Sequence, residues 1–291
     1  MKRQKLSSEC ILCLVKKHVS LENQNVQNKT QATLDLLKIV ASATLDKGAP
    51  EILDEITAYK EQKLGIFEDF SKEKQQFNAL MLACEEKLKK QIFSSADQIQ
   101  ATVKLCLAAN YIDFGSLDSV CDDEVLSKLD SALDFNIDLC ELTNLKNDIL
   151  SAKNIVYLLD NCGEIVLDKL FIELILSLNP SARVTAVVRG GNVLNDCTTD
   201  DAKQVNLDAL VPVLQNGSRI AGTCLNKVNA QTLEAINSAD VIISKGQGNF
   251  ETMRGERKNT YFLFLCKCAL FAREFSVPLF TPMLLNDLRI K

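Results

Sequence analysis

Tryptophan is absent from this 291-residue sequence, and histidine occurs only once. That histidine, His18, follows two lysines in a predicted helix, where we expect an exposed side chain. The sequence therefore does not favour a Ser-His-Asp hydrolase or a histidine-based phosphatase. No apolar run reaches the roughly 18–20 residues that a membrane-spanning helix needs, and the first residues lack the apolar core of a signal peptide. We expect a cytoplasmic protein that does not bind a membrane.

Basic residues are in the minority, with 33 Lys and Arg against 38 Asp and Glu and a formal net charge of -5. A chain without a positive field is a poor partner for a phosphate backbone, so we expect no nucleic-acid partner. Apolar residues make up 47% and charged residues 24%, which is ordinary for a globular protein. The length allows one large domain or two modest ones. The sequence makes no prediction of the oligomeric state.

Cysteine is plentiful, with eleven residues scattered through apolar stretches. Reduced thiols in such stretches behave as small buried apolar groups, which favours a reducing compartment over a disulfide scaffold. Cys10 and Cys13 form a C-x-x-C pair, and Cys266 and Cys268 lie near the other end of the chain. Four thiolates could bind zinc, but C-x-C is a poor second half of a zinc site. Buried reduced cysteines are the default interpretation, and a redox disulfide is a third one.

The two halves of the chain differ in the spacing of their apolar residues. Up to about residue 150, apolar residues recur at helical spacing, as at residues 30–45 and 77–93. Ser95, with Gln98 three residues later, has the pattern of a capping box and predicts a helix start. After residue 152, short β-branched runs alternate with helical stretches, which is typical of a parallel sheet. The four runs cover these residues: 154–160, 182–189, 210–215 and 240–245.

We therefore predict an α/β protein of two parts. Residues 1–150 form a helical domain that covers the cleft, and residues 151–291 form a doubly wound, mostly parallel, Rossmann-like three-layer domain that binds metal and carries the catalytic site. Doubly wound sheets bind their ligands beyond the carboxyl ends of the strands. The residues that follow each run are thus the candidates for the site.

The first such junction follows the apolar run 155–159. It begins with Asp160 and Asn161, and Glu164 lies in the first turn of the next predicted helix. A carboxylate beside a buried strand end needs a cation or amide donors. A carboxylate with an amide oxygen suits a hard divalent ion. The alternative is that Asp160 and Asn161 only cap the helix, and Glu164 is compatible with both interpretations because helix amino termini favour carboxylates.

A second junction ends in Arg189 and continues into a polar loop with Asn195 and Asp196. Asp196 could complete a three-ligand set that leaves coordination positions open for substrate oxygens. Asp200 and Asp201 are better explained as helix caps. The guanidinium of Arg189 suits phosphate, although an exposed surface position is the commoner explanation of a single arginine. We place Arg189 and Asn195, together with Glu164 of the first junction, among the substrate-binding candidates.

A third junction, Ser244 to Glu251, is similar to an anion cradle. Its glycines, Gly246 and Gly248, let backbone N–H groups approach a phosphate, and Lys245 adds a positive charge. The spacing matches neither a Walker loop nor a dinucleotide fingerprint. By itself this is a weak signal, and its position at another strand end gives it weight.

These junctions and three other segments, in their order and spacing, resemble the family once catalogued as domain of unknown function eighty-nine, now described as metal-dependent damage-control phosphatases. The likeness spans nearly the whole chain and points to the microbial-type branch with the C-x-x-C pair. The matching segments are ECILC, AANYIDFG, LLDNCGEIVLDKL, VVRGGNVLNDCTTDDA, ISKGQGNFE and FLFLCKCALFA.

The resemblance implies that Asp160, Asn161 and Asp196 are metal ligands and that Lys245 contacts the substrate phosphate. Three further positions match the polar residues that line the family's cleft: Asn110, Asp113 and Asn249. Without the resemblance, Asn110 and Asp113 would be interpreted only as residues that cap a helix or turn the chain.

The implied activity is hydrolysis of a phosphate ester on a small phosphorylated metabolite, one that is damaged or present in excess. We expect one divalent cation, Mg²⁺, Mn²⁺, Co²⁺ or Ni²⁺, to clamp the phosphoryl group, with Asp160, Asp196 and Lys245 as catalytic residues. The nucleophile is either metal-activated water or Asp160 or Asp196, which would form an aspartyl phosphate. Two alternatives are a nucleotide-cofactor enzyme such as a methyltransferase, which needs a glycine-rich first loop, and a zinc or redox module built on Cys10 and Cys13.

Overall fold

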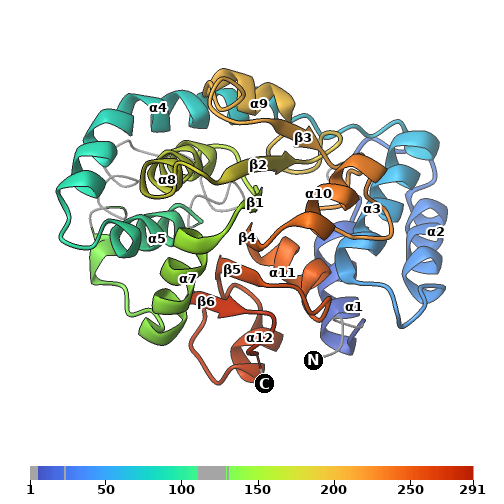
Figure 1. The fold of residues 1–291 in the computed structure, drawn as a ribbon. Coiled ribbons are helices and arrows are strands. Elements are labelled where there is room, and N and C mark those ends of the chain that lie inside the picture. Colours follow the sequence, from blue (N-terminus) through green and yellow to red (C-terminus); the bar gives the residue numbers. More distant parts are fainter. Residues whose placement is uncertain (1–5, 23, 111–128, 130, 291) are drawn as a thin grey trace.

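A six-stranded sheet organises the carboxyl-terminal half of the computed structural model, which describes residues 6–22, 24–110, 129 and 131–290 (Figure 1). The strand order is β3-β2-β1-β4-β5-β6. The first five strands are parallel, and β6 pairs with β5 in the antiparallel direction. The strands are β1 (Asn154–Leu158), β2 (Arg183–Val188), β3 (Val213–Gln215), β4 (Val241–Lys245), β5 (Thr260–Leu265) and β6 (Pro282–Asn286).

The sheet confirms the predicted α/β class. Each of the four predicted runs contains one strand, although only three residues of the third run pair, as β3. The sequence interpretation did not include β5 and β6. The apolar run of β5 continues into a short helix, so its pattern alone does not distinguish a strand from a buried helix. The order reverses between β1 and β4, and such a reversal is where doubly wound sheets bind their ligands.

Helices make up the regular structure that precedes β1 in the described residues, as predicted. The elements are α1 (Ser8–Leu14), the π-helical turn η1 (Val15–Val19), α2 (Lys29–Ala41), α3 (Ala49–Tyr59), the π-helical turn η2 (Lys60–Leu64), α4 (Ser71–Ser94), α5 (Gln98–Ala109), the 3-10 turn η4 (Ala132–Asp134) and α7 (Leu139–Ser151). The later helices are α8 (Glu164–Leu178), α9 (Thr199–Gln204), α10 (Ala230–Ser238), α11 (Gln247–Met253) and α12 (Ala269–Glu274). In the described part of the chain, no helix is both long enough and apolar enough to cross a membrane.

The predicted start of α5 is wrong by two residues. Asp97 is the N-cap, and its carboxylate accepts a hydrogen bond from the backbone N–H of Gln100. Ser95 instead ends α4, where its hydroxyl donates to the carbonyl of Gln91 at 2.7 Å. Serine and aspartate both satisfy free backbone groups at helix ends, so a sequence with both leaves the boundary uncertain by a turn.

Helices cover both faces of the sheet, which makes three layers. Alternate residues of β1 point to opposite faces: Ile155 and Tyr157 pack in a cluster with α4, α5, α7 and α8, whereas Val156 and Leu158 pack with α10, α11 and α12. The helices α4, α5 and α7 therefore share a core with the sheet. The predicted division into two domains at residue 150 stays a prediction.

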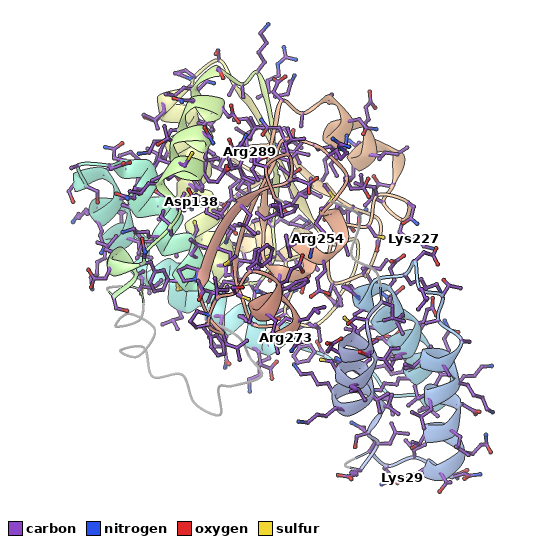
Figure 2. The ribbon with its side chains drawn as sticks, turned by 90° about the horizontal axis from the view of Figure 1, so that it is seen from below. Lys29, Asp138, Lys227, Arg254, Arg273 and Arg289 are labelled. Carbon is purple, nitrogen blue, oxygen red and sulfur yellow. The ribbon has the colours of Figure 1, made fainter. Side chains whose placement is uncertain are left out.

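The first helices form a lobe of their own. Residues of α1, α2 and α3 pack in a third cluster around Leu36, Ile52 and Ile56. Figure 2 shows these helices to one side of the sheet and its covering helices. Ion pairs between described residues connect the lobe to the rest of the chain, namely Glu61–Arg219 at 2.9 Å and Glu9–Arg273 at 2.6 Å.

Candidate active site

The loops that follow β1 and β2 are joined at the carboxyl end of the sheet. Asn161 and Asp196 form an isolated antiparallel bridge between the two loops. The backbone N–H of Cys197 donates to the carbonyl of Asp160 at 2.7 Å. Because parallel strands end at the same edge, short polar loops after neighbouring strands can pair in this way. The bridge fixes the three predicted metal ligands on one backbone frame.

Amide side chains orient the carboxylate of Asp160. Asn161 Nδ2 donates to Asp160 Oδ2 at 2.9 Å and to Glu164 Oε1 at 2.7 Å. Asn110 Nδ2, from the end of α5, donates to the same two oxygens at 3.3 and 2.7 Å. Asn110 therefore caps α5 and also enters the site, so its two predicted roles are both compatible with its place in the structure.

Arg189 is a buried residue, and the alternative of an exposed surface arginine is wrong: only 1% of it is exposed. Its Nε donates to Asp196 Oδ2 at 2.6 Å, and its terminal nitrogens reach Asp160 Oδ1 at 3.4 Å and Asn249 Oδ1 at 3.1 Å. Asn249 in turn donates to the carbonyls of Leu159 and of the last residue of β4. The guanidinium thus links the loops after β1, β2 and β4.

Lys245 is fully buried at the end of β4. Its Nζ lies 3.0 Å from Glu164 Oε2 and 2.9 Å from Asp168 Oδ1. Tyr157 of β1 also donates to Asp168 Oδ1, at 2.7 Å. Burial alone lowers the pKa of Lys245, but Asp168 and Glu164 raise this pKa well above its usual value. Lys245 therefore stays charged within the protein.

Negative charge is in excess in this network. The charged residues that these contacts connect are four carboxylates and two cations: Asp160, Glu164, Asp168, Asp196, Arg189 and Lys245. Burial raises the pKa of Asp160 well above its usual value, and the neighbouring carboxylates of Asp196 and Glu164 raise it further, against the effects of Arg189 and Lys245. Burial also raises the pKa of Asp196 despite its ion pair with Arg189. An additional cation would relieve this repulsion.

The free oxygens of the site suit such a cation. Asn161 turns its nitrogen toward the carboxylates, and neither its Oδ1 nor Asp196 Oδ1 accepts a hydrogen bond from the described residues. No group of three or more His, Cys, Asp or Glu side chains in the described part of the chain could hold a metal. A set centred on Asp160 and Asp196 therefore needs the amide oxygen of Asn161. Carboxylate and amide oxygens are donors that hard divalent ions prefer.

The absence of a side chain on Gly246 leaves room for the carboxylate of Asp160. Its φ of +78° is a conformation that side chains rarely adopt, and a Cβ atom on it would overlap the carboxylate of Asp160. The glycine thus lets the start of the loop after β4 approach the first predicted ligand closely. The close approach of Asp160 explains why glycine is needed at this position, and it is a more specific explanation than the flexibility of an anion-binding loop.

A cavity of about 650 Å³ opens between these loops and the amino-terminal lobe. Five of the predicted site residues line it: Asn110, Asp160, Asn161, Asn195 and Asp196. Five others lie outside its lining, although the network connects four of them to it: Glu164, Arg189, Lys245, Gly246 and Asn249. Asp113 lies outside the described residues.

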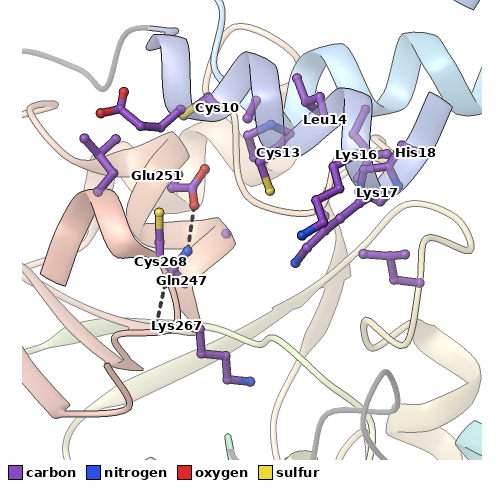
Figure 3. A pocket seen from close by; sticks show the side chains of 18 of the residues that line it. Cys10, Cys13, Leu14, Lys16, Lys17, His18, Gln247, Glu251, Lys267 and Cys268 are labelled. Atoms are coloured by element: carbon purple, nitrogen blue, oxygen red, sulfur yellow. Dashed lines mark hydrogen bonds between the residues drawn. The ribbon is translucent and has the colours of Figure 1, made fainter. Parts of the chain in front are cut away.

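The facing wall comes from α1 and η1, and the segment between β5 and α12 lies across the cavity from it (Figure 3). The facing wall includes Cys10, Cys13, Lys16, Lys17 and His18, and the other segment contributes Lys267 and Cys268. His18 is half-buried rather than exposed as expected. Burial, and then the charges of Lys60 and Lys17, lower its pKa to about 4, so His18 is neutral at pH 7.

The ten cysteines in the described residues are free thiols. Cys10, Cys13 and Cys268 line the cavity, whereas Cys266 is buried and its Sγ contacts the carbonyl of Cys268 at 3.8 Å. Within the described part of the chain these thiols make no group of three that could hold a metal. The geometry gives no support to a four-thiolate zinc site.

Asp168 is the principal site residue that the sequence interpretation missed. It lies four residues after Glu164 in α8, so the two side chains share one face of the helix. A carboxylate inside the apolar stretch of residues 165–175 was the signal that could have identified it. Lys16 and Lys17 have no comparable local signal, because two lysines in a helix are ordinary on a surface.

Comparison with known proteins identifies the family of this chain. The model of the damage-control phosphatase ARMT1-like domain matches residues 6–281. A damage-control phosphatase of Pyrococcus horikoshii is 29% identical over 94% of this chain and 95% of its own. A damage-control phosphatase of Archaeoglobus fulgidus is 26% identical, with 95% and 96% covered. A crystal structure of a DUF89 family protein from P. horikoshii superposes with a TM-score of 0.85 at 27% identity, over 97% of this chain and 99% of the other.

The match to the family model spans nearly the whole chain, and the relatives are covered over nearly their whole lengths. The family and the fold agree with what the resemblance in the sequence implied. The chain belongs to the damage-control phosphatase ARMT1-like domain family.

Proposed function

We propose that this chain is a metal-dependent phosphatase that hydrolyses phosphate monoesters of small metabolites, such as sugar phosphates or damaged phosphometabolites. One observation carries the proposal: Asp160, Asn161 and Asp196 share one cavity at the strand-order reversal, within a network that has an excess of buried negative charge. The names of the relatives, two of them damage-control phosphatases, support the same reaction class.

The three residues would hold one divalent cation through Asn161 Oδ1, Asp196 Oδ1 and the carboxylate of Asp160. Such a cation supplies Lewis-acid stabilisation of the charge on the phosphoryl oxygens. Arg189 holds Asp196 by a 2.6 Å hydrogen bond and so fixes which carboxylate oxygen faces the cavity. Asn110 and Asn195, which also line the cavity, are proposed to contact the substrate. Asn195 suits this role because its Nδ2 is buried and has no hydrogen-bond partner among the residues that the structure describes.

We propose that Lys245 does not contact the substrate and instead positions residues that line the cavity. It is 0% exposed and its ammonium is bonded to Glu164 and Asp168, so in this structure it does not face the cavity. We propose that it keeps Glu164 in place, and that Glu164 in turn holds the amides of Asn110 and Asn161. Lys245 then positions the ligand set, whereas the resemblance implied a contact with the phosphate.

The cavity volume limits the size of the substrate. About 650 Å³ is within the range of roughly 300–1,000 Å³ typical of small-molecule sites. A phosphorylated sugar or cofactor fragment fits such a volume, whereas a phosphoprotein would have to insert a loop beneath the amino-terminal lobe. We therefore propose a small phosphorylated metabolite as the substrate.

Metal dependence is the first test. Purified protein is expected to hydrolyse a generic aryl phosphate after addition of Mg²⁺, Mn²⁺, Co²⁺ or Ni²⁺, and to lose the activity in excess chelator, as measured by phosphate release. The Cys10→Ser, Cys13→Ser double variant should still require metal for hydrolysis. Full activity in excess chelator would refute the proposal, and loss of all hydrolysis in the cysteine variant would favour a thiol-based module.

A glycine substitution gives a second test. Gly246→Ala is expected to lower kcat about a hundredfold or more, because its methyl group must displace the carboxylate of Asp160. Gly65→Ala is the matched control: its φ is +67°, but nothing lies within 4 Å of the added Cβ. Both variants strain the backbone, by about 1 kcal/mol for Gly65 in the left-handed region and by about 1–3 kcal/mol for Gly246, whose ψ is 159°. Only Gly246→Ala also has the clash. Equal activities of the two variants would argue against the placement of Asp160 in the site.

The methyltransferase alternative has little support in the geometry. The first loop contains one glycine, Gly163, and is occupied by the carboxylate and amide network of Asp160 and Asn161. A dinucleotide or adenosyl group needs a glycine-rich first loop that presents backbone N–H groups to an anion. Carboxylates at that position would repel the anionic group of such a cofactor.

A further inference from the structure

The cavity has walls of opposite charge. Its floor, at the sheet end, carries the carboxylates of Asp160 and Asp196. Lys16 and Lys17 line the facing wall on η1, and Lys267 lines the cavity between β5 and α12. Figure 3 shows Lys16 and Lys17 extending from their helix toward the interior of the pocket. Lys16 and Lys17 belong to a lobe that shares no core with the sheet.

The positive charge of the facing wall is not cancelled locally. Lys16 and Lys17 are exposed, and within the described part of the chain neither makes an ion pair. Two further acidic side chains that line the cavity have other partners: Glu9 of α1 pairs with Arg273 at 2.6 Å, and Glu251 of α11 accepts a hydrogen bond from Gln247 at 2.9 Å. The remaining titratable group of η1, His18, is neutral at pH 7.

A substrate phosphate at the floor leaves this wall without a partner. A phosphoryl group held by Asp160, Asn161 and Asp196 through a cation occupies only one side of the cavity. A neutral sugar end would then face two ammonium groups that stay in water, whereas an anionic end would form charge-assisted hydrogen bonds with them. The arrangement thus favours metabolites with an anionic group at this end over metabolites with a neutral end.

We infer that the site prefers substrates that carry a second anionic group, phosphate or carboxylate, at the end opposite the scissile phosphate, and that Lys16 and Lys17 bind this group. The inference rests on the proposed phosphatase function for the position of the first phosphate. Lys16 and Lys17 then determine specificity and take no part in the chemical step. Their effect belongs in KM and not in kcat if they bind the second anion equally strongly in the bound substrate and in the transition state, because such uniform binding changes KM alone.

The test compares three substrates under saturating metal: a hexose monophosphate, a hexose bisphosphate and a phosphorylated sugar acid. The double variant Lys16→Ala, Lys17→Ala is compared with wild type and with Lys63→Ala, an exposed lysine of η2 that does not line the cavity. Alanine is a good helix former, so the variants are expected to fold.

For substrates with two anionic groups, the double variant should raise KM about tenfold and leave kcat within about twofold, since two exposed charge contacts act together. KM for the monophosphate should change less than about twofold, and Lys63→Ala should behave as wild type. The wild-type preference should also weaken at high salt, because the lysines are exposed to solvent. The bisphosphate and the sugar acid show whether phosphate, carboxylate or both are accepted.

Equal KM changes for all three substrates in the double variant, or no wild-type preference for two anionic groups, would overturn the inference. Binding of the bisphosphate and the monophosphate by calorimetry separates this result from failure of the proposed function. If no substrate is hydrolysed but the bisphosphate binds about tenfold more tightly and loses this advantage in the double variant, the phosphatase proposal fails and the second-anion site stands. If hydrolysis occurs without the preference, only the inference fails.

Discussion

Asp160→Asn is expected to reduce turnover at least about a thousandfold while the protein remains folded. Asp160 is the residue on which the network converges: it accepts hydrogen bonds from Asn110 and Asn161, and Arg189 reaches its other oxygen. Replacing one carboxylate oxygen with an amide nitrogen keeps the shape but removes the negative charge that would hold a divalent cation. Asp196→Asn should have an effect of similar size.

Thermal unfolding distinguishes loss of metal binding from loss of structure. Without metal, Asp160→Asn should unfold near the wild-type temperature, because two effects oppose each other. It removes a charge that burial and the neighbouring carboxylates disfavour, but its amide nitrogen replaces an oxygen that accepts hydrogen bonds in wild type. Metal at one hundred times its Kd should stabilise wild type by about 2.7 kcal/mol and the variant by much less. Asp200→Ala is the control, since this carboxylate lies in the first turn of α9, just after the loop of Asp196, with its side chain 91% exposed. If Asp160→Asn keeps wild-type turnover, or if Asp200→Ala loses as much, the site assignment is wrong.

Lys245→Met is expected to destabilise the protein by about 3–5 kcal/mol, because it leaves two buried carboxylates without their cation. Lys245, Glu164 and Asp168 are each 0% exposed, so water cannot replace the lost charge. A typical folding free energy is only about 5–15 kcal/mol, so the variant should approach the limit of stability. The measurement is the free energy of unfolding in urea at pH 7.

A compensating variant tests whether the unpaired carboxylates cause the loss of stability. Adding Glu164→Gln and Asp168→Asn to Lys245→Met removes the unpaired charges and should recover most of the lost stability, though not activity, because Glu164 also holds the amides of the ligand set. Lys203→Met is the matched control: its side chain is 66% exposed and lies 3.9 Å from Asp200, so it should change stability by less than about 0.5 kcal/mol. If Lys245→Met is as stable as wild type but loses activity, Lys245 contacts the substrate phosphate, as the resemblance implied, and its proposed positioning role is wrong.

The predicted metal ligands come from local patterns with simple physical causes. A continuous apolar run that ends in Asp160 and Asn161 predicts a buried strand with polar groups at its end, and the same holds for the run before the loop of Asp196. Neighbouring parallel strands then bring both loops to one edge. The α/β class and the all-helical first half follow from the same periodicities.

The partners of the charged residues were not predictable in this way. Arg189 could be interpreted as a surface residue and Lys245 as a phosphate contact, whereas both are buried in ion pairs with carboxylates from other elements. Glu164 could be interpreted as a helix-end carboxylate, and it lies between the amides and Lys245. Sequence shows that a residue is charged but not which opposite charge it meets, because that choice is made by packing between distant segments.

By itself, the sequence predicted a mostly parallel sheet, the first four of its strands and the candidate ligands that follow β1 and β2, since a two-residue or 3.6-residue periodicity and the residues that follow it are local properties. Only the tertiary structure decided the rest of the site. It placed Lys16 and Lys17 against loops that follow them by about 140 residues or more, and it set four buried carboxylates against two cations. Burial and charge balance depend on which segments pack together, and no local pattern contains that information.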